Sequence, residues 1–378
     1  MNQIRLNLKA RSNNRSMFVG GEFYSDARWL MDSPTLSTAG STFLNGGKAC
    51  LIVIADYLLE HGINNILLPS YLCPTIVNTL ERVGLGCEYY QVNPDFSLDL
   101  GDLDRKAAHA RAVYFINYFG FLHPPEVRAY LACLRQKGVM IIEDNAQAGF
   151  PGHAIGDFIF NSLRKLAAHD GGYLTTALDV APSIKKYLGR PNRRLPVIRA
   201  YRERLADYLY QGKGSHDELV KLYELAETCY EEDMAVEGDP QERQQIERLD
   251  WPGIKQARRD NYAYLLGLIA EIHELSPVFP ALQEDNLPLG LPVYVSGVDR
   301  DWLFDRLGRA GIGLTIHWEE LLRDPRLNGS QAAVEMAGKI LTLVIDQRTS
   351  HKQMDYLAQN LSDCIQDAKS KRKGGFSF

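Results

Sequence analysis

The chain has 378 residues, of which 45% are apolar and 24% are charged, and it carries a formal net charge of −5. This composition is typical of a soluble globular protein, and the length exceeds what one compact core usually holds, so we expect two domains. The negative net charge offers no electrostatic footprint for nucleic acid or for an anionic membrane. We therefore expect an enzyme that acts on small molecules.

The cysteines are scattered along the chain without a C-x-x-C pair or a metal-ligand spacing, which predicts reduced thiols and no metal site. They are Cys50, Cys73, Cys87, Cys133, Cys229 and Cys364. The first residues, MNQIRLNLKARSNN, lack the uninterrupted apolar segment of a signal peptide, and no apolar run is long enough to span a bilayer. These features predict a cytoplasmic protein.

The first 42 residues show no helical or strand period and predict an irregular arm. Residues 45–49 then open a helix whose apolar positions fall on one face. Strands and helices alternate after it, with strands expected at 65–69, 87–92 and 112–119, a helix from after Thr75 to about Val83 and another at 124–137. Repeated strand, helix, strand units imply a parallel sheet with right-handed crossovers.

The stretch from Val139 to Leu174, VMIIEDNAQAGFPGHAIGDFIFNSLRKLAAHDGGYL, holds the chemically informative residues. It opens with a short apolar run, typical of a buried strand, that ends at Asp144. Ligands bind at the carboxyl ends of strands in an open α/β sheet, so an acid at this point is a candidate site residue. Ser162 and Lys165 follow, before a turn that leads into another apolar run.

A lysine, an acid and a serine near strand ends are the groups that pyridoxal 5'-phosphate chemistry uses. The lysine amine can hold the cofactor aldehyde as a Schiff base and can move the proton at the substrate carbon. An aspartate that faces the pyridine nitrogen keeps this nitrogen protonated, so the ring can accept electrons. Lys165 and Asp144 are our candidates for these roles. Taken singly, each is more often a solvated lysine or a turn-capping aspartate, and only their combination favours a site.

The motifs E-D-N-A-Q-A at 143–148, G-D-F at 156–158, S-L-R-K at 162–165 and D-G-G at 170–172 resemble the DegT/StrS group of aminotransferases. This group is best known for aminating keto-sugars and lies within fold type I of the pyridoxal phosphate enzymes. The likeness extends from about Phe43 to about Leu361. It implies an α/β protein with a mostly parallel central sheet and a smaller α+β C-terminal domain.

The resemblance also implies roles for single residues around the cofactor ring. Lys165 matches the Schiff-base lysine of the family, and Asp144 matches the partner of the pyridine nitrogen. Gln147 matches the glutamine beside the 3-hydroxyl group. Ser162 is placed like the phosphate-binding serine of fold type I enzymes, although the sugar aminotransferases set theirs slightly further upstream.

The expected phosphate loop lies at the start of the helix that follows Asn45. Gly47, Lys48 and Ala49 match the family's loop in placement, with Lys48 where the family has a threonine. Free N–H groups at a helix start favour an anion, and the ammonium of Lys48 would replace the lost hydroxyl contact. The family keeps an aromatic residue that stacks on the ring at the position of Cys73, so Tyr71 or another residue would cover the ring here.

Substrate contacts are expected from two further segments. Asn117 and Tyr118 match a family position near the cofactor and the substrate, while a tight turn is the other reading of this segment and accounts for Gly120. His317, followed by Trp318, matches the place where the family often has a histidine. It could touch substrate, or it could simply be packed in the core.

We expect the chain to divide into four parts, which are an N-terminal arm (1–42), a large cofactor-binding α/β domain (43–245), a small C-terminal α+β domain (246–368) and a disordered tail (369–378). Within the large domain, the strand at 173–177 would run antiparallel to its neighbours, as in fold type I. The small domain would contain a long helix from about Glu247, strands at 291–298 and 313–317, a helix at 301–310 and a closing strand from Ile340.

The expected function is that of a pyridoxal phosphate-dependent aminotransferase on a small keto substrate, either a sugar or a specialised metabolite. Its partners would be an amino donor, a keto acceptor and a second copy of the chain, since the family forms homodimers with shared active sites. Arg193, Arg194 and Arg199 are candidates for contacts to the partner. Lys165 argues against the dehydratases of the family, which replace this lysine by histidine.

Two alternatives stay open at this point. One is another carbanion reaction on the same cofactor, such as that of a lyase, cyclase or decarboxylase. The other is a regulatory or binding protein that kept the fold and lost turnover.

Overall fold

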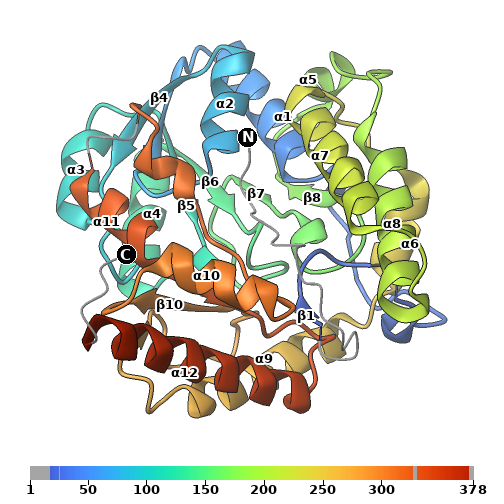
Figure 1. The fold of residues 1–378 in the computed structure, drawn as a ribbon. Coiled ribbons are helices and arrows are strands. Elements are labelled where there is room, and N and C mark those ends of the chain that lie inside the picture. The colour runs from blue at the N-terminus through green and yellow to red at the C-terminus, as the bar shows by residue number, and fades with distance from the viewer. Residues whose placement is uncertain (1–17, 25, 327–329, 374–378) are drawn as a thin grey trace.

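The structure of the protein is a computed structural model, which describes residues 18–24, 26–326 and 330–373. Its centre is a seven-stranded sheet with the order β2-β8-β7-β6-β5-β3-β4 (Figure 1). The strands of this sheet are β2 (Ser41–Leu44), β3 (Asn65–Pro69), β4 (Gly86–Tyr90), β5 (Ala112–Ile116), β6 (Met140–Asp144), β7 (Phe158–Phe160) and β8 (Gly172–Thr175). The pairs from β7 to β4 are parallel, whereas β8 runs antiparallel to both β7 and β2. The expected mostly parallel sheet with one reversed strand is therefore confirmed.

Helices cover the sheet, and this explains why its strands read as continuous apolar runs. Every residue of β5 is buried, as is typical of parallel strands that are covered on both faces. The helices of this part are α1 (Gly47–Glu60), α2 (Pro74–Val83), α3 (Leu100–Ala107), α4 (Pro125–Gln136) and α5 (Ala181–Lys185). All residues of α1 from Gly47 to Leu58 are buried, so this helix lies inside the domain and not on its surface.

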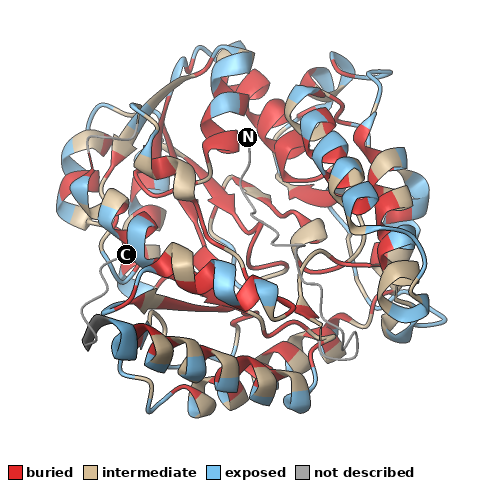
Figure 2. Cartoon of the chain, viewed as in Figure 1, coloured by how far each residue is buried: buried red, intermediate tan, exposed pale blue. Residues whose placement is uncertain are grey.

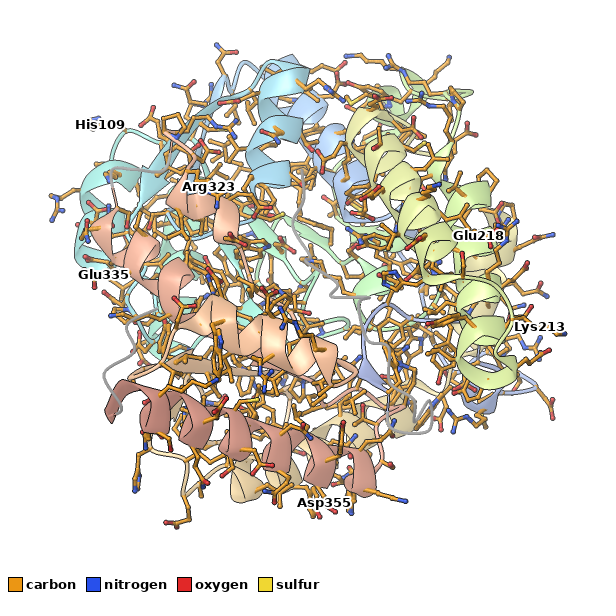
Figure 3. All side chains as sticks on the ribbon, in the orientation of Figure 1. His109, Lys213, Glu218, Arg323, Glu335 and Asp355 are labelled. Carbon is orange, nitrogen blue, oxygen red and sulfur yellow. The ribbon has the colours of Figure 1, made fainter. Side chains whose placement is uncertain are left out.

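A helical hairpin extends the large domain on one side. It consists of α6 (Arg194–Gln211) and α7 (His216–Glu232), and α8 (Pro240–Arg248) follows it. Gly212 ends α6 in the left-handed conformation, and the Ser215 side chain accepts a hydrogen bond at the start of α7. The outer faces of these helices are exposed and the inner faces are buried (Figure 2), and Lys213 and Glu218 point outward from the hairpin (Figure 3).

The C-terminal part forms a smaller α+β layer. Its three-stranded sheet has the order β12-β10-β9 with antiparallel pairs, and β1 (Val19–Gly20) of the N-terminal segment pairs with β11 in parallel. The elements are α9 (Trp251–Leu268), β9 (Leu275–Pro277), β10 (Leu291–Val295), α10 (Arg300–Arg309), β11 (Ile312–Gly313), α11 (Gln331–Lys339), β12 (Ile340–Leu343) and α12 (His351–Lys373). Short 3-10 turns occur at Ala27–Trp29, Tyr118–Gly120, Leu163–Lys165 and Glu319–Leu322.

Several expected boundaries differ from the structure. The strand expected to reach Phe119 ends at Ile116, because Phe119 has a positive φ of 53° and the chain turns there. The strand expected at 313–317 is only Ile312–Gly313. Residues 369–373 of the expected disordered tail belong to α12, while residues 374–378 and most of the expected arm lie outside the described residues.

The arginines expected at a partner surface are engaged within the chain. Arg194 is buried, and Arg193 and Arg199 pair with acids of their own chain. In the described part of the chain, no helix has the length and apolar character needed to cross a membrane.

Gly120 marks the point where the large domain meets the C-terminal layer. Its φ is +87°, and a Cβ atom there would lie 1.8 Å from the backbone oxygen of Leu287. The Leu287 N–H donates to the Gly120 carbonyl at 3.2 Å, and the Leu289 N–H donates to Phe119 at 2.8 Å. A side chain at Gly120 would therefore force these two segments apart.

We predict that Gly120→Ala lowers the free energy of unfolding by about 2 to 5 kcal/mol, since it adds a backbone clash to left-handed strain. Gly138→Ala is the matched control, because Gly138 has a similar φ of +88° with nothing within 4 Å of its Cβ position. We expect Gly138→Ala to lower the free energy of unfolding by about 1 kcal/mol. Urea unfolding measures both, and equal losses would contradict the role of the Leu287 contact.

Candidate active site

A cavity lies at the carboxyl ends of the central strands, between the start of α1 and the C-terminal layer. Its lining includes eight of the residues expected from the sequence, namely Gly47, Lys48, Cys73, Asp144, Gln147, Ser162, Lys165 and His317. These residues come from five different segments of the chain. The parallel arrangement of the strands brings them together, because it places all strand ends on one edge of the sheet.

Lys165 and Asp144 are the central pair of charges in this cavity. Asp144 ends β6, and Lys165 ends the short turn that follows β7, which pairs with β6 in parallel. Burial lowers the pKa of Lys165, and Cys73 and Asp144 only partly oppose this shift. Burial also raises the pKa of Asp144, while Lys165 pulls it down. Each group therefore shifts the pKa of the other in the direction opposite to the effect of burial.

The Asp144 carboxylate is held in a fixed orientation. One oxygen accepts the backbone N–H of Ala146 at 2.7 Å, and the other accepts the hydroxyl of Tyr114. Tyr114 is completely buried in β5, so this contact cannot be replaced by bulk water. The carboxylate is thus preorganised to face a positive group in the cavity.

Gln147 has an unused donor at the cavity. Its side-chain oxygen accepts the backbone N–H of Phe119 at 2.7 Å. Its Nε2 atom is buried, and among the described residues it has no hydrogen-bond partner. A buried donor without a partner is costly, which indicates that a ligand atom satisfies it.

The start of α1 forms a cradle beside Ser162. The first N–H groups of a helix have no intrahelical acceptor and attract anions. A Cβ atom at Gly47 would lie 3.1 Å from the Cβ of Ser162, so only glycine leaves this space open. Gly46 precedes the helix with a φ of +114°. This geometry fits a phosphate group, with Ser162 as an additional donor.

Lys48 does not point at this cradle. Its ammonium group donates to the backbone oxygens of Tyr230 and Glu231 at the end of α7. Burial lowers the pKa of Lys48 to about 8. The side chain therefore fastens α7 to α1, and only the backbone of Lys48 belongs to the first turn. Ala49 is buried within α1.

Cys73, and not Tyr71, lines the cavity. Tyr71 is completely buried, donates its hydroxyl to the His317 carbonyl and packs edge-on against Phe96 at 5.0 Å. Tyr118 donates to the Tyr71 carbonyl from the same aromatic cluster. Tyr71 and Tyr118 thus belong to an aromatic cluster that lies behind the residues lining the cavity.

Asn117 is also buried, and its side chain donates to Glu143 and Asn145. His317 does face the cavity, with Nδ1 bonded to the Thr342 hydroxyl at 2.9 Å. Burial, followed by the charge of Lys165, lowers the pKa of His317 to about 3, so its ring is neutral. Of the three expected substrate residues, the structure brings only His317 to the cavity.

Sequence analysis did not single out three further residues of the lining, Arg164, Tyr230 and Arg258. Arg164 lies within the S-L-R-K motif, directly before Lys165, and this adjacency could have identified it as a site residue. Tyr230 lies at the end of α7, 65 positions from Lys165, and no local pattern connects the two.

No model of a known protein family matches the chain. A curated relative, the dTDP-4-dehydro-2,3,6-trideoxy-D-glucose 4-aminotransferase of Saccharopolyspora spinosa, is 31% identical over 146 residues. This match covers 36% of the chain and 37% of the relative's length.

Solved structures resemble nearly the whole chain at low identity. PseC of Helicobacter pylori, an aminotransferase involved in the biosynthesis of pseudoaminic acid, has a TM-score of 0.69 at 12% identity, over 93% of this chain and 99% of its own. DesI, solved in the presence of its TDP-sugar product, has a TM-score of 0.65 at 16% identity. The match covers 100% of this chain and 96% of DesI. Spr1654 of Streptococcus pneumoniae, assigned as a sugar aminotransferase and solved in its PLP form, has a TM-score of 0.63 at 14% identity. The match covers 93% of this chain and 99% of Spr1654. The fold is that of the sugar aminotransferases.

The sugar aminotransferase fold agrees with the expectation drawn from the sequence motifs, namely fold type I with a mostly parallel sheet and a smaller C-terminal layer. The roles of single residues in the cavity remain predictions. They rest on the contacts described above.

The cradle at Gly47 can be tested with phosphate alone. We predict that Gly47→Ala raises the dissociation constant of inorganic phosphate at least about tenfold, because the added methyl group fills the space beside Ser162. Gly267→Ala is the control, since a Cβ at Gly267 meets nothing within 4 Å. Isothermal titration calorimetry measures both variants, and unchanged phosphate binding in Gly47→Ala would remove the cradle from the site.

Proposed function

We propose that the protein is a pyridoxal phosphate-dependent aminotransferase that acts on a keto-sugar or a related small keto substrate. The observation that carries this proposal is the placement of Lys165 and Asp144 in one desolvated cavity at the carboxyl ends of neighbouring strands. The keto-sugar is suggested by the relatives, which include a dTDP-sugar 4-aminotransferase and a protein solved with a TDP-sugar product.

The residues of the cavity fit the cofactor. The Nε2 atom of Gln147, which has no hydrogen-bond partner among the described residues, would offer a donor to the ring, and the open space at Gly47 with Ser162 suits the phosphate. Asp144 offers a fixed negative charge for a protonated ring nitrogen. Spr1654, which shares the fold, has been solved in both PLP and PMP forms.

When bound, pyridoxal phosphate supplies an aldehyde for amine exchange and a ring that accepts electrons from the substrate carbon. Lys165 would hold the aldehyde, and its amine would serve as the base that takes the proton from the substrate carbon. Its lowered pKa favours the neutral amine that this step requires. Asp144 would bind the protonated ring nitrogen, and Tyr114 holds its carboxylate in place. The neutral ring of His317 faces the same space.

We also propose that the enzyme is a cytoplasmic homodimer that completes each active site with its partner. The resemblance to DegT/StrS aminotransferases suggests the dimer, and the α6–α7 hairpin carries exposed apolar side chains, with Tyr210 67% and Leu225 50% exposed. The cysteines are free thiols, which suits a reducing compartment. Its partners are an amino donor and a keto acceptor, without a nucleic acid or a membrane.

Spectroscopy of half-reactions tests the proposed function. We predict that an amino acid such as glutamate or glutamine, added alone, bleaches the absorbance of the cofactor held by Lys165. A keto acceptor should then restore it, because a transaminase leaves the donor's amino group on the cofactor until an acceptor takes it.

A lyase, cyclase or decarboxylase would instead convert its substrate and regain the original absorbance after each turnover. Conversion of a substrate with the absorbance intact, together with no bleaching by a broad panel of donors, would replace the aminotransferase by this alternative. If the protein bound neither cofactor nor donor, this result would favour the alternative of a regulatory or binding protein that kept the fold and lost turnover.

A further inference from the structure

Arg164 is a cation of the cavity that forms no ion pair within the described part of the chain. It directly precedes Lys165, lines the same cavity and is only partly exposed. Among the described residues, no carboxylate lies within the 4.0 Å of an ion pair. Its Nε atom is buried without a hydrogen-bond partner in this part of the chain. Such a guanidinium is costly to keep unless a ligand satisfies it.

The neighbouring arginines differ from Arg164 in their ion pairs, although Arg194 and Arg202 also have buried nitrogens without a hydrogen-bond partner among the described residues. Arg194 pairs with Asp170 and with Glu227, both at 2.8 Å, and Arg202 pairs with Asp170 at 2.7 Å. These carboxylates lie close enough to affect Arg164 but are committed to other partners. Burial alone would lower the pKa of Arg164, but Tyr230, Glu227 and Asp170 together raise it well above its ordinary value. Arg164 therefore stays charged and directs that charge at the cavity.

Tyr230 holds the Arg164 side chain in position. The guanidinium carbon lies 4.5 Å from the centroid of the Tyr230 ring, in a cation–π contact. Tyr230 is itself fixed, because the Lys48 ammonium binds its backbone oxygen at the end of α7. A guanidinium held in this way loses little freedom when it binds a planar anion, and two parallel N–H groups match a carboxylate.

Arg258 also lines the cavity, but its donors are used by the protein. Its Nε donates to Gln347, and its Nη1 donates to the backbone oxygens of Pro288 and Leu289. These bonds fasten α9 to the loop before β10. Of the two cavity arginines without an ion pair in the described chain, Arg164 is the one with an unpartnered buried Nε, while Tyr230 supplies its side-chain hydrogen bond.

We propose that Arg164 binds the carboxylate of the amino-acid donor. This inference rests on the proposed function and adds the group that recognises the donor. The cradle at α1 already suits the cofactor phosphate, and Asp144 suits the ring nitrogen, so Arg164 is the cation that remains for the substrate. Its position directly before Lys165 places the carboxylate site beside the amine that exchanges with the donor.

The test compares Arg164→Met and Arg164→Lys with a matched control, Arg190→Met. Arg190 stacks on Tyr187 at 4.6 Å, but it is exposed on the surface. For each protein, the bleaching of the cofactor absorbance is titrated with the best amino donor, with its α-carboxamide and with its side-chain amide where one exists. Cofactor affinity is titrated separately.

We expect Arg164→Met to raise the half-saturating donor concentration about 30-fold or more, as for a lost hydrogen-bonded charge pair. Arg164→Lys should give an intermediate value, because it keeps the charge and loses the planar fork. Arg190→Met should behave as the wild type. Wild-type protein should prefer the acid to the amide that replaces the bound carboxylate, and Arg164→Met should lose this preference. Cofactor affinity should stay unchanged.

Three results would overturn the proposal. One is weaker cofactor binding in Arg164→Met with donor binding intact, which would place the cofactor phosphate on Arg164. Another is a change confined to the keto acceptor, which would assign Arg164 to an anion of that substrate. The last is an undiminished preference for the acid in both Arg164 variants.

Calorimetry with succinate separates this inference from the proposed function. Succinate cannot donate an amino group, so its binding reports the carboxylate site without turnover. If no amino acid bleaches the wild-type protein, the aminotransferase proposal fails and the donor assignment fails with it. Succinate binding that is lost in Arg164→Met would then still locate a carboxylate site at this arginine.

Discussion

The burial of one negative and one positive charge in the same cavity is the constraint on which the site depends. Asp144 ends β6 and Lys165 lies in the turn after β7, which pairs with β6 in parallel, and this arrangement buries both groups at the cavity. Desolvation disfavours both charges, the charge of each group opposes this effect on the other, and Tyr114 and the Ala146 N–H bind the carboxylate. The same desolvation lowers the pKa of the lysine, as a nucleophilic amine requires.

A second set of buried charged residues positions the segments that line the cavity around this pair. Asp170 follows the Lys165 turn and binds two arginines of α6, and Glu227 of α7 binds one of them. These contacts dock the helical hairpin against the strand ends, and Lys48 fastens the end of α7 from the other side. The hairpin therefore belongs to the site, because it carries Tyr230 to Arg164.

Much of the fold was predictable because its signals are local. The strand at 65–69 has the expected bounds, since an apolar run is read directly from neighbouring residues, and the next helix ends at Val83 as expected but begins earlier, at Pro74. The helices α3 and α11 and the strand β7 were not anticipated. The last of these has only three residues and depends on its neighbours in the sheet for its hydrogen bonds.

The site residues that lie within a sequence motif were predictable, and those whose positions depend on the packing of distant segments were less so. Lys165, Asp144, Gln147 and Ser162 lie in one stretch of sequence and meet in the cavity. Tyr71 and Tyr118 were expected near the ligand, but they join an aromatic cluster behind the wall, because each hydroxyl finds a backbone carbonyl there. The relation of Tyr230 to Arg164 depends on the docking of a distant helix, which no local pattern encodes.

The central claim is that Lys165 is the residue that holds the cofactor. Two lysines, Lys48 and Lys165, line the described cavity, so the most direct measurement reduces the cofactor-loaded protein with borohydride and maps the labelled peptide by mass spectrometry. We predict the label on Lys165, none on Lys48, and no label in a folded Lys165→Ala variant. A label on Lys48, or one that persists in Lys165→Ala, would contradict the account.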